Sequence, residues 1–301
     1  MTDRPTNAGA PRSDEYPAAS RRPRRNEVDA WGVSHPGKVR TENQDHFLLA
    51  NINKRIEVLR TNLTKEDHLI PEGEQRLAFL AMVADGVGGG AGGREASATA
   101  LQAIMEYADG MITTYLAKRD DEREFAALLQ AAAQRAHEAV LERREQSGVR
   151  GTMATTLTVY MGLWPTYYLL QVGDSRYYVF NQGTLRQVTR DQTIAQDLVD
   201  QGALTQAVAA RTPMAHVLSS AIGSDATAPV VHKLSSDWAN VHLLCSDGLT
   251  KHVSDERIAE VLGTMTSARQ AGEQLLQDAL DGGGKDNVTV VVVRTVPRDD
   301  A

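Results

Sequence analysis

Short apolar runs that lead directly into an aspartate are the feature of this sequence that most restricts its fold. Residues 77–84, LAFLAMVA, are almost continuously apolar and are followed by an Asp-Gly pair that starts at Asp85. Residues 240–246, NVHLLCS, are followed by a second Asp-Gly pair that starts at Asp247. Runs of this length and composition are typical of strands whose two faces are both buried. The sequence therefore predicts buried strands with a carboxylate at the end.

Composition and periodicity predict further strands. Strands that are neighbours along the chain are expected to pair with each other. Turn-like breaks separate two pairs of β-rich runs, which indicates two hairpins. Helical blocks interrupt the strands irregularly, so a regular alternation of parallel strands and helices is disfavoured. This pattern favours an α+β sandwich with sheets inside and helices outside. The strands are expected at 154–161, 166–173, 176–181, 184–189 and 287–295, and the helices at 94–108, at 122–146 and from Ser267 onward.

The composition excludes several classes of protein. The chain has 301 residues, of which 42% are hydrophobic and 24% charged, as in an ordinary globular domain. A net charge of −7 and an aromatic content of 5% argue against a nucleic-acid-binding protein. No run reaches the roughly 18 apolar residues that a membrane span needs. Cys245 is the only cysteine and can form no internal disulfide, so we expect a cytoplasmic protein that contacts neither membrane nor nucleic acid.

Two segments differ in composition from the rest. Residues 1–26 contain four prolines, an arginine cluster and almost no large apolar side chains, which predicts a disordered, solvated tail. Residues 51–76 are highly charged and show no clear period, so they are interpreted as an insertion. One folded domain is expected over residues 27–298.

Six glycines among residues 86–93 allow two interpretations. A phosphate-binding loop requires a lysine and a hydroxyl residue after its last glycine, but Arg94 and Glu95 stand here. A dinucleotide fingerprint can be spelled from the glycines, but it lacks its acidic partner after a second parallel strand. Alternatively, the bare backbone lets the chain crowd around a metal ion that Asp85 holds. The metal interpretation predicts further carboxylates at other strand ends.

Such carboxylates are present at five predicted strand junctions. A single Asp-Gly pair is most often a turn, because both residues favour turn conformations. Five aspartates at five junctions, two of them in the same apolar-x-Asp-Gly frame, are hard to explain as independent turns. Magnesium and manganese prefer oxygen ligands, mainly carboxylates, carbonyls and water. The sequence therefore predicts one divalent-cation site built from Asp45, Asp85, Asp174, Asp247 and Asp286.

Taken together, six motifs resemble a known family. In order along the chain they are VRTENQD, VADGVGGG, GTMATTLTV, VGDSRYY, LLCSDGLT and KDNVTVVVV. The set is similar to that of the metal-dependent serine/threonine protein phosphatases of type 2C, and the similarity runs from about residue 28 to residue 296. The resemblance implies a four-layer α-β-β-α sandwich, in which helix pairs flank two antiparallel sheets. It also implies two divalent cations, manganese or magnesium, in a cleft at one end.

The resemblance assigns a metal-binding role to most of these acids. Asp85 is similar to the carboxylate that bridges both cations, and Gly86 to the residue that offers its backbone carbonyl. Asp247 and Asp286 resemble direct ligands of one cation. Asp45 resembles an acid that holds the other cation, partly through water. In this family the attacking group is a hydroxide that bridges the two cations, which implies hydrolysis without a phosphoenzyme.

The remaining positions concern a third cation, the phosphate and two departures from the family pattern. Asp174, with Asp247 beside it, is similar to the residue that helps to bind a looser third cation. Arg40 resembles the guanidinium that receives the substrate phosphate. Gln44 stands where some members have glutamate, and Val87 where animal members have a histidine. Both departures suggest a bacterial-type member, in which water protonates the leaving alcohol.

The resemblance implies a monomeric phosphatase that acts on phosphoserine and phosphothreonine in proteins. It also implies that the enzyme opposes a serine/threonine kinase, which is expected among its partners. Two other functions stay open: a catalytically silent module that binds phosphoproteins, and an enzyme that binds a nucleotide at the glycine loop. His46 and His216 lack metal-ligand spacing and are interpreted as packing or surface residues.

Overall fold

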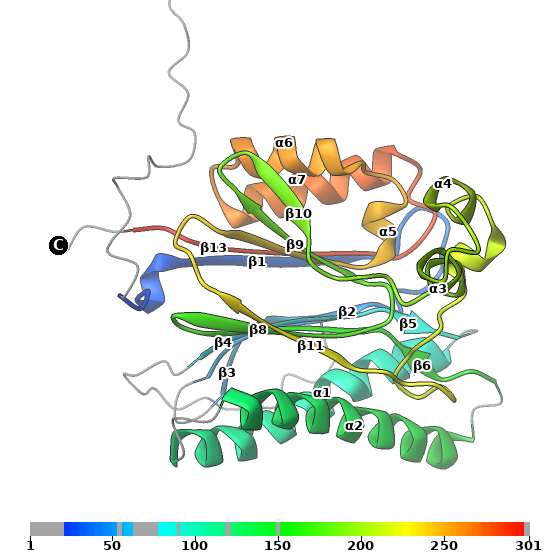
Figure 1. Cartoon of the computed structure of the whole chain (residues 1–301), viewed down its shortest axis with the longest axis horizontal. Coiled ribbons are helices and arrows are strands. Elements are labelled where there is room, and N and C mark those ends of the chain that lie inside the picture. The colour runs from blue at the N-terminus through cyan, green and yellow to red at the C-terminus, as the bar shows by residue number, and fades with distance from the viewer. Residues whose placement is uncertain are drawn as a thin grey trace, which may run out of the picture.

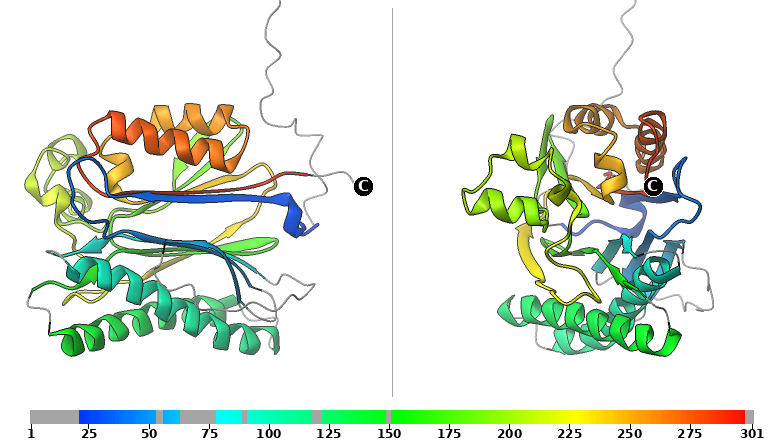
Figure 2. Two further views of the ribbon diagram at one scale, coloured as in Figure 1. Left: turned by 180° about the vertical axis from the view of Figure 1, so that it is seen from behind. Right: turned by 90° about the vertical axis from the view of Figure 1, so that its right-hand side faces the viewer.

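Two antiparallel sheets lie face to face, and a pair of long helices covers the outer face of each (Figures 1 and 2). This computed structural model describes residues 21–52, 56–62, 78–88, 91–117, 122–148 and 151–297. The predicted four-layer α-β-β-α sandwich is confirmed. Within the described residues, no helix is both long and apolar enough to cross a membrane.

Every pairing in the two main sheets is antiparallel. The five-stranded sheet has the order β1 (Val28–His35), β13 (Val288–Thr295), β12 (Val241–Cys245), β9 (Arg176–Asn181) and β10 (Thr184–Gln187). The six-stranded sheet has the order β11 (Val230–Ser235), β8 (Thr166–Val172), β7 (Leu157–Leu163), β4 (Ala78–Ala84), β2 (His46–Ile52) and β3 (Ile56–Thr61). The short strands β5 (Gly86–Val87) and β6 (Ala154–Thr155) pair with each other.

The helices form the outer layers and close one end of the sandwich. Helices α1 (Ala91–Ala117) and α2 (Glu122–Ser147) cover the six-stranded sheet, while α6 (Asp255–Thr264) and α7 (Ala268–Asp281) cover the five-stranded sheet (Figure 1). The short elements α3 (Ile194–Asp200), α4 (Gln206–Ala209) and η3 (Pro213–His216) lie together at the end where the one-turn helix α5 (Asp247–Thr250) follows β12.

Strand β4 shows why the apolar runs are continuous. Its side chains alternate between two separate apolar layers, because successive residues of a strand point to opposite faces. One set packs between the two sheets, and the other packs between the six-stranded sheet and helices α1 and α2. Both layers exclude water, so no position of β4 tolerates a polar side chain. The first set is Phe79, Ala81 and Val83, and the second is Leu80, Met82 and Ala84.

Most predicted elements are found, with shifted boundaries. The two hairpins are β7–β8 and β9–β10. Helix α1 begins at Ala91, inside the glycine segment, which is three residues earlier than predicted. Helix α7 begins after Ser267, as predicted, and the Ser267 side chain accepts a hydrogen bond from the backbone N–H of Gln270. The Gln270 side chain accepts a hydrogen bond from the N–H of Thr266.

The two segments of unusual composition are partly described. Residues 21–26 of the predicted tail belong to the described chain, and the tail itself stays a prediction. Arg21 forms an ion pair with the fully buried Glu27 and stacks on the ring of Trp238. Residues 56–61 of the expected insertion form strand β3 at the edge of a sheet. Residues 1–20, 53–55 and 63–77 lie outside the described residues.

The close approach of α5 to β13 depends on Gly248. A Cβ atom at this position would lie 1.8 Å from the carbonyl oxygen of Asn287, which is backbone and cannot move aside cheaply. Asp247 precedes Gly248 in the chain, and Asp286 precedes Asn287. The two aspartates are therefore held beside each other by a contact that only glycine permits.

We expect Gly248→Ala to destabilise the protein by about 1–3 kcal/mol, as overpacking of a close contact usually does. Thermal unfolding measures this as a fall in melting temperature. Gly110→Ala is the matched control, because no atom lies within 4 Å of its added Cβ in helix α1. That control should be neutral or stabilising by up to about 1 kcal/mol. Equal effects of the two substitutions would contradict the packing argument.

Candidate metal and phosphate site

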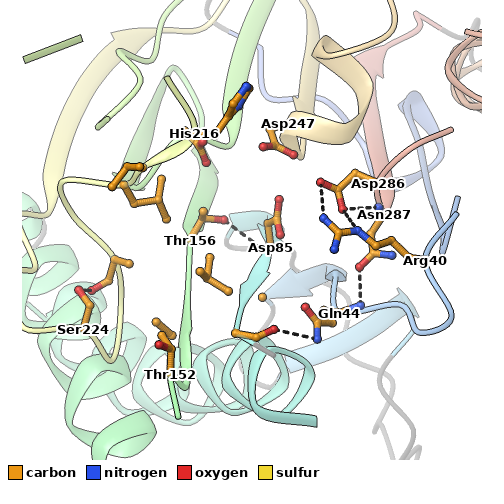
Figure 3. Close-up of a pocket in the computed structure, with 18 of the residues that line it drawn as sticks. Arg40, Gln44, Asp85, Thr152, Thr156, His216, Ser224, Asp247, Asp286 and Asn287 are labelled. Carbon is orange, nitrogen blue, oxygen red and sulfur yellow. Dashed lines mark hydrogen bonds and ion pairs between the residues drawn. The ribbon is translucent and has the colours of Figure 1, made fainter. Parts of the chain in front are cut away.

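A pocket of about 570 Å³ lies at the end of the sandwich beside α5 and η3 (Figure 3). Six of the seven residues predicted for the site line it. The seventh, Asp45, is fully buried next to Asp85, and its charge helps to raise the pKa of Asp85. The structure thus brings together residues that are up to 246 positions apart in the chain. The six lining residues are Arg40, Asp85, Gly86, Asp174, Asp247 and Asp286.

Each aspartate stands at the end or the beginning of a strand or one-turn helix. Asp85 lies between β4 and β5, and Asp174 lies between β8 and β9. Asp247 is the first residue of α5, directly after β12. Asp45 immediately precedes β2, and Asp286 lies two residues before β13.

Antiparallel pairing explains why these positions meet. When two neighbouring strands run in opposite directions, one ends at the edge where the other begins. Strand β4 ends with Ala84 opposite His46, the first residue of β2. Strand β12 ends with Cys245 opposite Val290, near the beginning of β13. Both sheets therefore present an acid after one strand and an acid before its neighbour at the same end of the sandwich.

The glycines in this region serve close packing of the backbone. The N–H of Gly86 donates to the carbonyl oxygen of Gln44 at 3.2 Å. A Cβ on Gly86 would lie 2.2 Å from the carbonyl oxygen of Gly93, and one on Gly93 would lie 2.9 Å from the carbonyl oxygen of Gly86. Three chain segments therefore cross at a distance that side chains would prevent. This supports the second interpretation of the glycine segment, in which bare backbone surrounds the acid.

Asp45 has one satisfied and one unsatisfied oxygen. Oδ2 accepts hydrogen bonds from Ser246 at 2.7 Å and from Thr289 at 2.8 Å. Oδ1 is buried and has no hydrogen-bond partner in the described structure. Burial raises the pKa of this carboxyl to about 6, although the two hydroxyls act to lower it. A buried oxygen without a partner is costly, and a bound cation is one of the few groups that could satisfy it.

Mutual repulsion adds to burial at the centre of the pocket. Burial and the charges of Asp45, Asp247, Asp174 and Asp286 raise the pKa of Asp85 well above its usual range. Burial, followed by the charge of Asp247, raises the pKa of Asp174 to about 7. A positive charge placed among these acids would lower both pKa values. The pocket is therefore electrostatically suited to a cation.

Two basic side chains contact the rim acids. Lys251 Nζ lies 2.6 Å from Asp247 Oδ2 and 2.8 Å from Asp286 Oδ2. Arg40 donates from Nε and Nη2 to the two carboxylate oxygens of Asp286, at 2.9 and 3.2 Å. Burial acts to raise the pKa of Asp286, but the hydrogen bonds and charges of Lys251 and Arg40 outweigh it and lower that pKa. Asp286 is therefore ionised at neutral pH.

The donor set fits a hard divalent cation in its chemistry. The acids offer only oxygen ligands, which magnesium and manganese prefer. Among the described residues, however, no three His, Cys, Asp or Glu side chains are close enough together to hold one ion. Asp247 and Asp286 are instead turned toward Lys251 and Arg40. The convergence of the acids is observed, and the individual metal-ligand roles stay predictions.

Sequence reasoning missed several residues of the site. Lys251 carried no motif signal, and only its helical i, i+4 spacing from Asp247 indicates a contact. Ser246 and Thr289, which hold Asp45, are ordinary strand-end residues in the sequence. His216 was interpreted as a packing or surface residue, but its exposed side chain lines the pocket (Figure 3). His46 is buried and shares a hydrogen bond with Ser97, as a packing residue would.

A sandwich of this layering, with acids gathered at one end, matches the architecture that the sequence resemblance implied. The family model described as "Protein phosphatase 2C" matches residues 57–282, which is more than half of the chain. The chain belongs to the protein phosphatase 2C family.

Relatives in sequence and structure agree with this assignment. The chain is 35% identical over 225 residues to the serine/threonine protein phosphatase PstP of Mycobacterium tuberculosis, covering 74% of this chain but only 41% of that protein. It is 28% identical to the serine/threonine phosphatase stp of Listeria welshimeri, covering 71% of this chain and 83% of that protein. A crystal structure of the PstP catalytic domain in complex with two manganese ions superposes with a TM-score of 0.66 at 30% identity, covering 90% of this chain and 99% of that one.

The raised pKa of Asp174 predicts a pH-dependent effect on stability. A carboxyl whose pKa is higher in the folded than in the unfolded chain binds protons more tightly when folded. Its ionisation therefore costs stability as the pH rises from its ordinary pKa of 3.8 to about 7. With chelator present, Asp174→Asn should be more stable than the unsubstituted protein, and the advantage should grow between pH 5 and pH 8. Thermal unfolding at the two pH values measures this, and an advantage that does not grow would contradict it.

Proposed function

We propose that the chain is a metal-dependent phosphatase that hydrolyses phosphoserine and phosphothreonine in proteins. The observation that carries the proposal is the convergence of four strand-end aspartates and one arginine at a single pocket, with a fifth aspartate, Asp45, buried next to Asp85. Membership of the protein phosphatase 2C family supports it, as do the names of the relatives from Mycobacterium tuberculosis and Listeria welshimeri.

Two divalent cations are the cofactors that we propose, in line with the two manganese ions of the PstP structure. When bound, such cations lower the pKa of a contacting water and offset the charge of a phosphate. The acids that would hold them are Asp45, Asp85, Asp247 and Asp286, with the backbone carbonyl of Gly86. Asp174, whose pKa the charge of Asp247 helps to raise, is the residue that we propose for a weaker third cation.

Arg40 is suited to bind the substrate phosphate. Its side chain is 57% exposed and lies at the rim, so a phosphate in the pocket can reach it. Its guanidinium is planar and permanently charged, and it can donate two parallel hydrogen bonds to two phosphate oxygens. Pairing with Asp286 orients the guanidinium by two hydrogen bonds, from Nε and Nη2, and leaves Nη1 outside that pair. Phosphate oxygens can therefore be bound without a new side-chain conformation.

A polypeptide substrate fits the surface beside the pocket. His216, Val217 and Leu218 line its wall, and apolar side chains of the neighbouring short helices are exposed. Exposed apolar residues next to a charged pocket are suited to contact the chain on either side of a phosphorylated residue. On this basis we propose phosphoproteins as substrates. The opposing enzyme would then be the serine/threonine kinase that phosphorylates them. The exposed apolar residues of this surface are Ile194, Val208, Met214 and Val217.

Hydrolysis of p-nitrophenyl phosphate and of a phosphothreonine peptide tests the function. We expect hydrolysis with manganese and its loss with chelator, because the acids alone cannot bind an anion. Asp247→Asn should lower the rate at least about 100-fold with an unchanged circular dichroism spectrum. Phosphopeptide binding without hydrolysis would indicate the silent module instead. Nucleotide binding that is independent of metal would indicate the nucleotide enzyme.

Replacement of Arg40 separates phosphate binding from metal binding. Loss of a charge-assisted pair of hydrogen bonds costs about 1.5–3 kcal/mol, which corresponds to roughly 10- to 150-fold in affinity. We therefore expect Arg40→Ala to raise the inhibition constant of inorganic phosphate at least about tenfold. The manganese concentration for half-maximal activity should change much less. Arg135→Ala, which removes an exposed arginine on α2, is the control and should alter neither value. An unchanged inhibition constant in Arg40→Ala would refute the assignment.

A further inference from the structure

Lys251 occupies the space between two acids of the proposed metal site. Its Nζ lies within 2.8 Å of an oxygen of both Asp247 and Asp286. The side chain is only 29% exposed and belongs to the wall of the pocket. It reaches this place because Lys251 caps the end of α5, four residues and about one helical turn after Asp247. A single ammonium group thus bridges the two carboxylates that the family pattern assigns to one cation.

The charge balance of the pocket shows how much depends on this lysine. Five aspartates converge, and within the described residues only Arg40 and Lys251 form ion pairs with any of them. Arg40 contacts Asp286 alone, so Lys251 is the only ion-pair partner of Asp247 in the described part of the chain. Two like-charged carboxylates held at one amine nitrogen repel each other strongly unless the positive charge stays between them.

We propose that Lys251 is a resident counter-ion of the metal site. Its ammonium group neutralises Asp247 and Asp286 when no cation is bound, and a divalent cation that binds between these two acids has to displace it. This inference rests on the proposed function only in so far as that function places a cation there. Lys251 is a positioning residue, because it acts through the two carboxylates.

Two consequences have opposite signs. Removal of the ammonium group frees both carboxylates and removes a competing positive charge, so the affinity for a divalent cation rises. The same change leaves the acids without their counter-ion, so the metal-free protein becomes less stable. A lysine with a merely structural role would produce only the second effect. The combination of tighter metal binding and lower metal-free stability is therefore specific to a displaced counter-ion.

Lys251→Met tests the proposal, because methionine keeps an unbranched side chain and removes the charge. Isothermal titration of manganese into the metal-stripped full-length chain should give a dissociation constant at least about fivefold lower than that of the unsubstituted protein. In the presence of chelator, the melting temperature of Lys251→Met should be lower than that of the unsubstituted protein. Lys285→Met is the matched control, since Lys285 is an exposed lysine next to Asp286 that forms no ion pair in the described structure. The dissociation constant for manganese and the melting temperature of Lys285→Met should both stay close to those of the unsubstituted protein.

Lys251→Arg and Lys251→Gln complete the test. Lys251→Arg keeps the charge, and its dissociation constant for manganese should stay within threefold of that of the unsubstituted protein. Lys251→Gln also removes the charge, so it takes the place of Lys251→Met in the test if the methionine variant does not fold. If the unsubstituted protein binds manganese and the uncharged variants bind it equally or more weakly, the counter-ion proposal is wrong and the proposed function stands. If the unsubstituted protein neither binds manganese nor hydrolyses a phosphate monoester, the proposed function is wrong as well.

Discussion

Repulsion among carboxylates at one end of the sandwich is the constraint on which the rest of the structure depends. Five acids share a small volume, and burial combined with neighbouring charges raises the pKa of Asp85 and Asp174. Such a group of acids destabilises any chain that has to assemble it. The two sheets and three apolar layers around it supply the stability that the pocket lacks. The apolar strands and the acids at their ends are therefore parts of one arrangement.

The fold keeps the acids in place with backbone geometry and small polar groups. Gly86, Gly93 and Gly248 allow main chains to approach closely enough that the adjacent acids cannot move apart. Ser246 and Thr289 hold one oxygen of the most buried acid and leave the other oxygen unsatisfied. Hydroxyl groups suit this task, because they donate a hydrogen bond without adding a charge that would compete with a cation.

The strand-end aspartates could be predicted from sequence because their signal is local. An apolar run, an acid and a glycine stand side by side in the chain, and antiparallel pairing brings such ends together. Lys251 and His216 could not be predicted in the same way, since their place in the pocket depends on how a one-turn helix and a short 3₁₀ helix sit against the sheets. The contact of Arg21 with Trp238 could not be predicted either, because the two residues are 217 positions apart in the chain.

The basic residues of the rim differ in a way that follows from their chemistry. Arg40 approaches Asp286 with a planar fork and stays largely exposed, so it can bind an anion while it remains paired. Lys251 approaches two acids with one compact charge and is more enclosed. The Lys251 ammonium group lies between two carboxylates, where a metal ion would bind. The Arg40 guanidinium lies at the rim and leaves that place open. The difference between arginine and lysine therefore separates a group that accompanies the cations from one that competes with them.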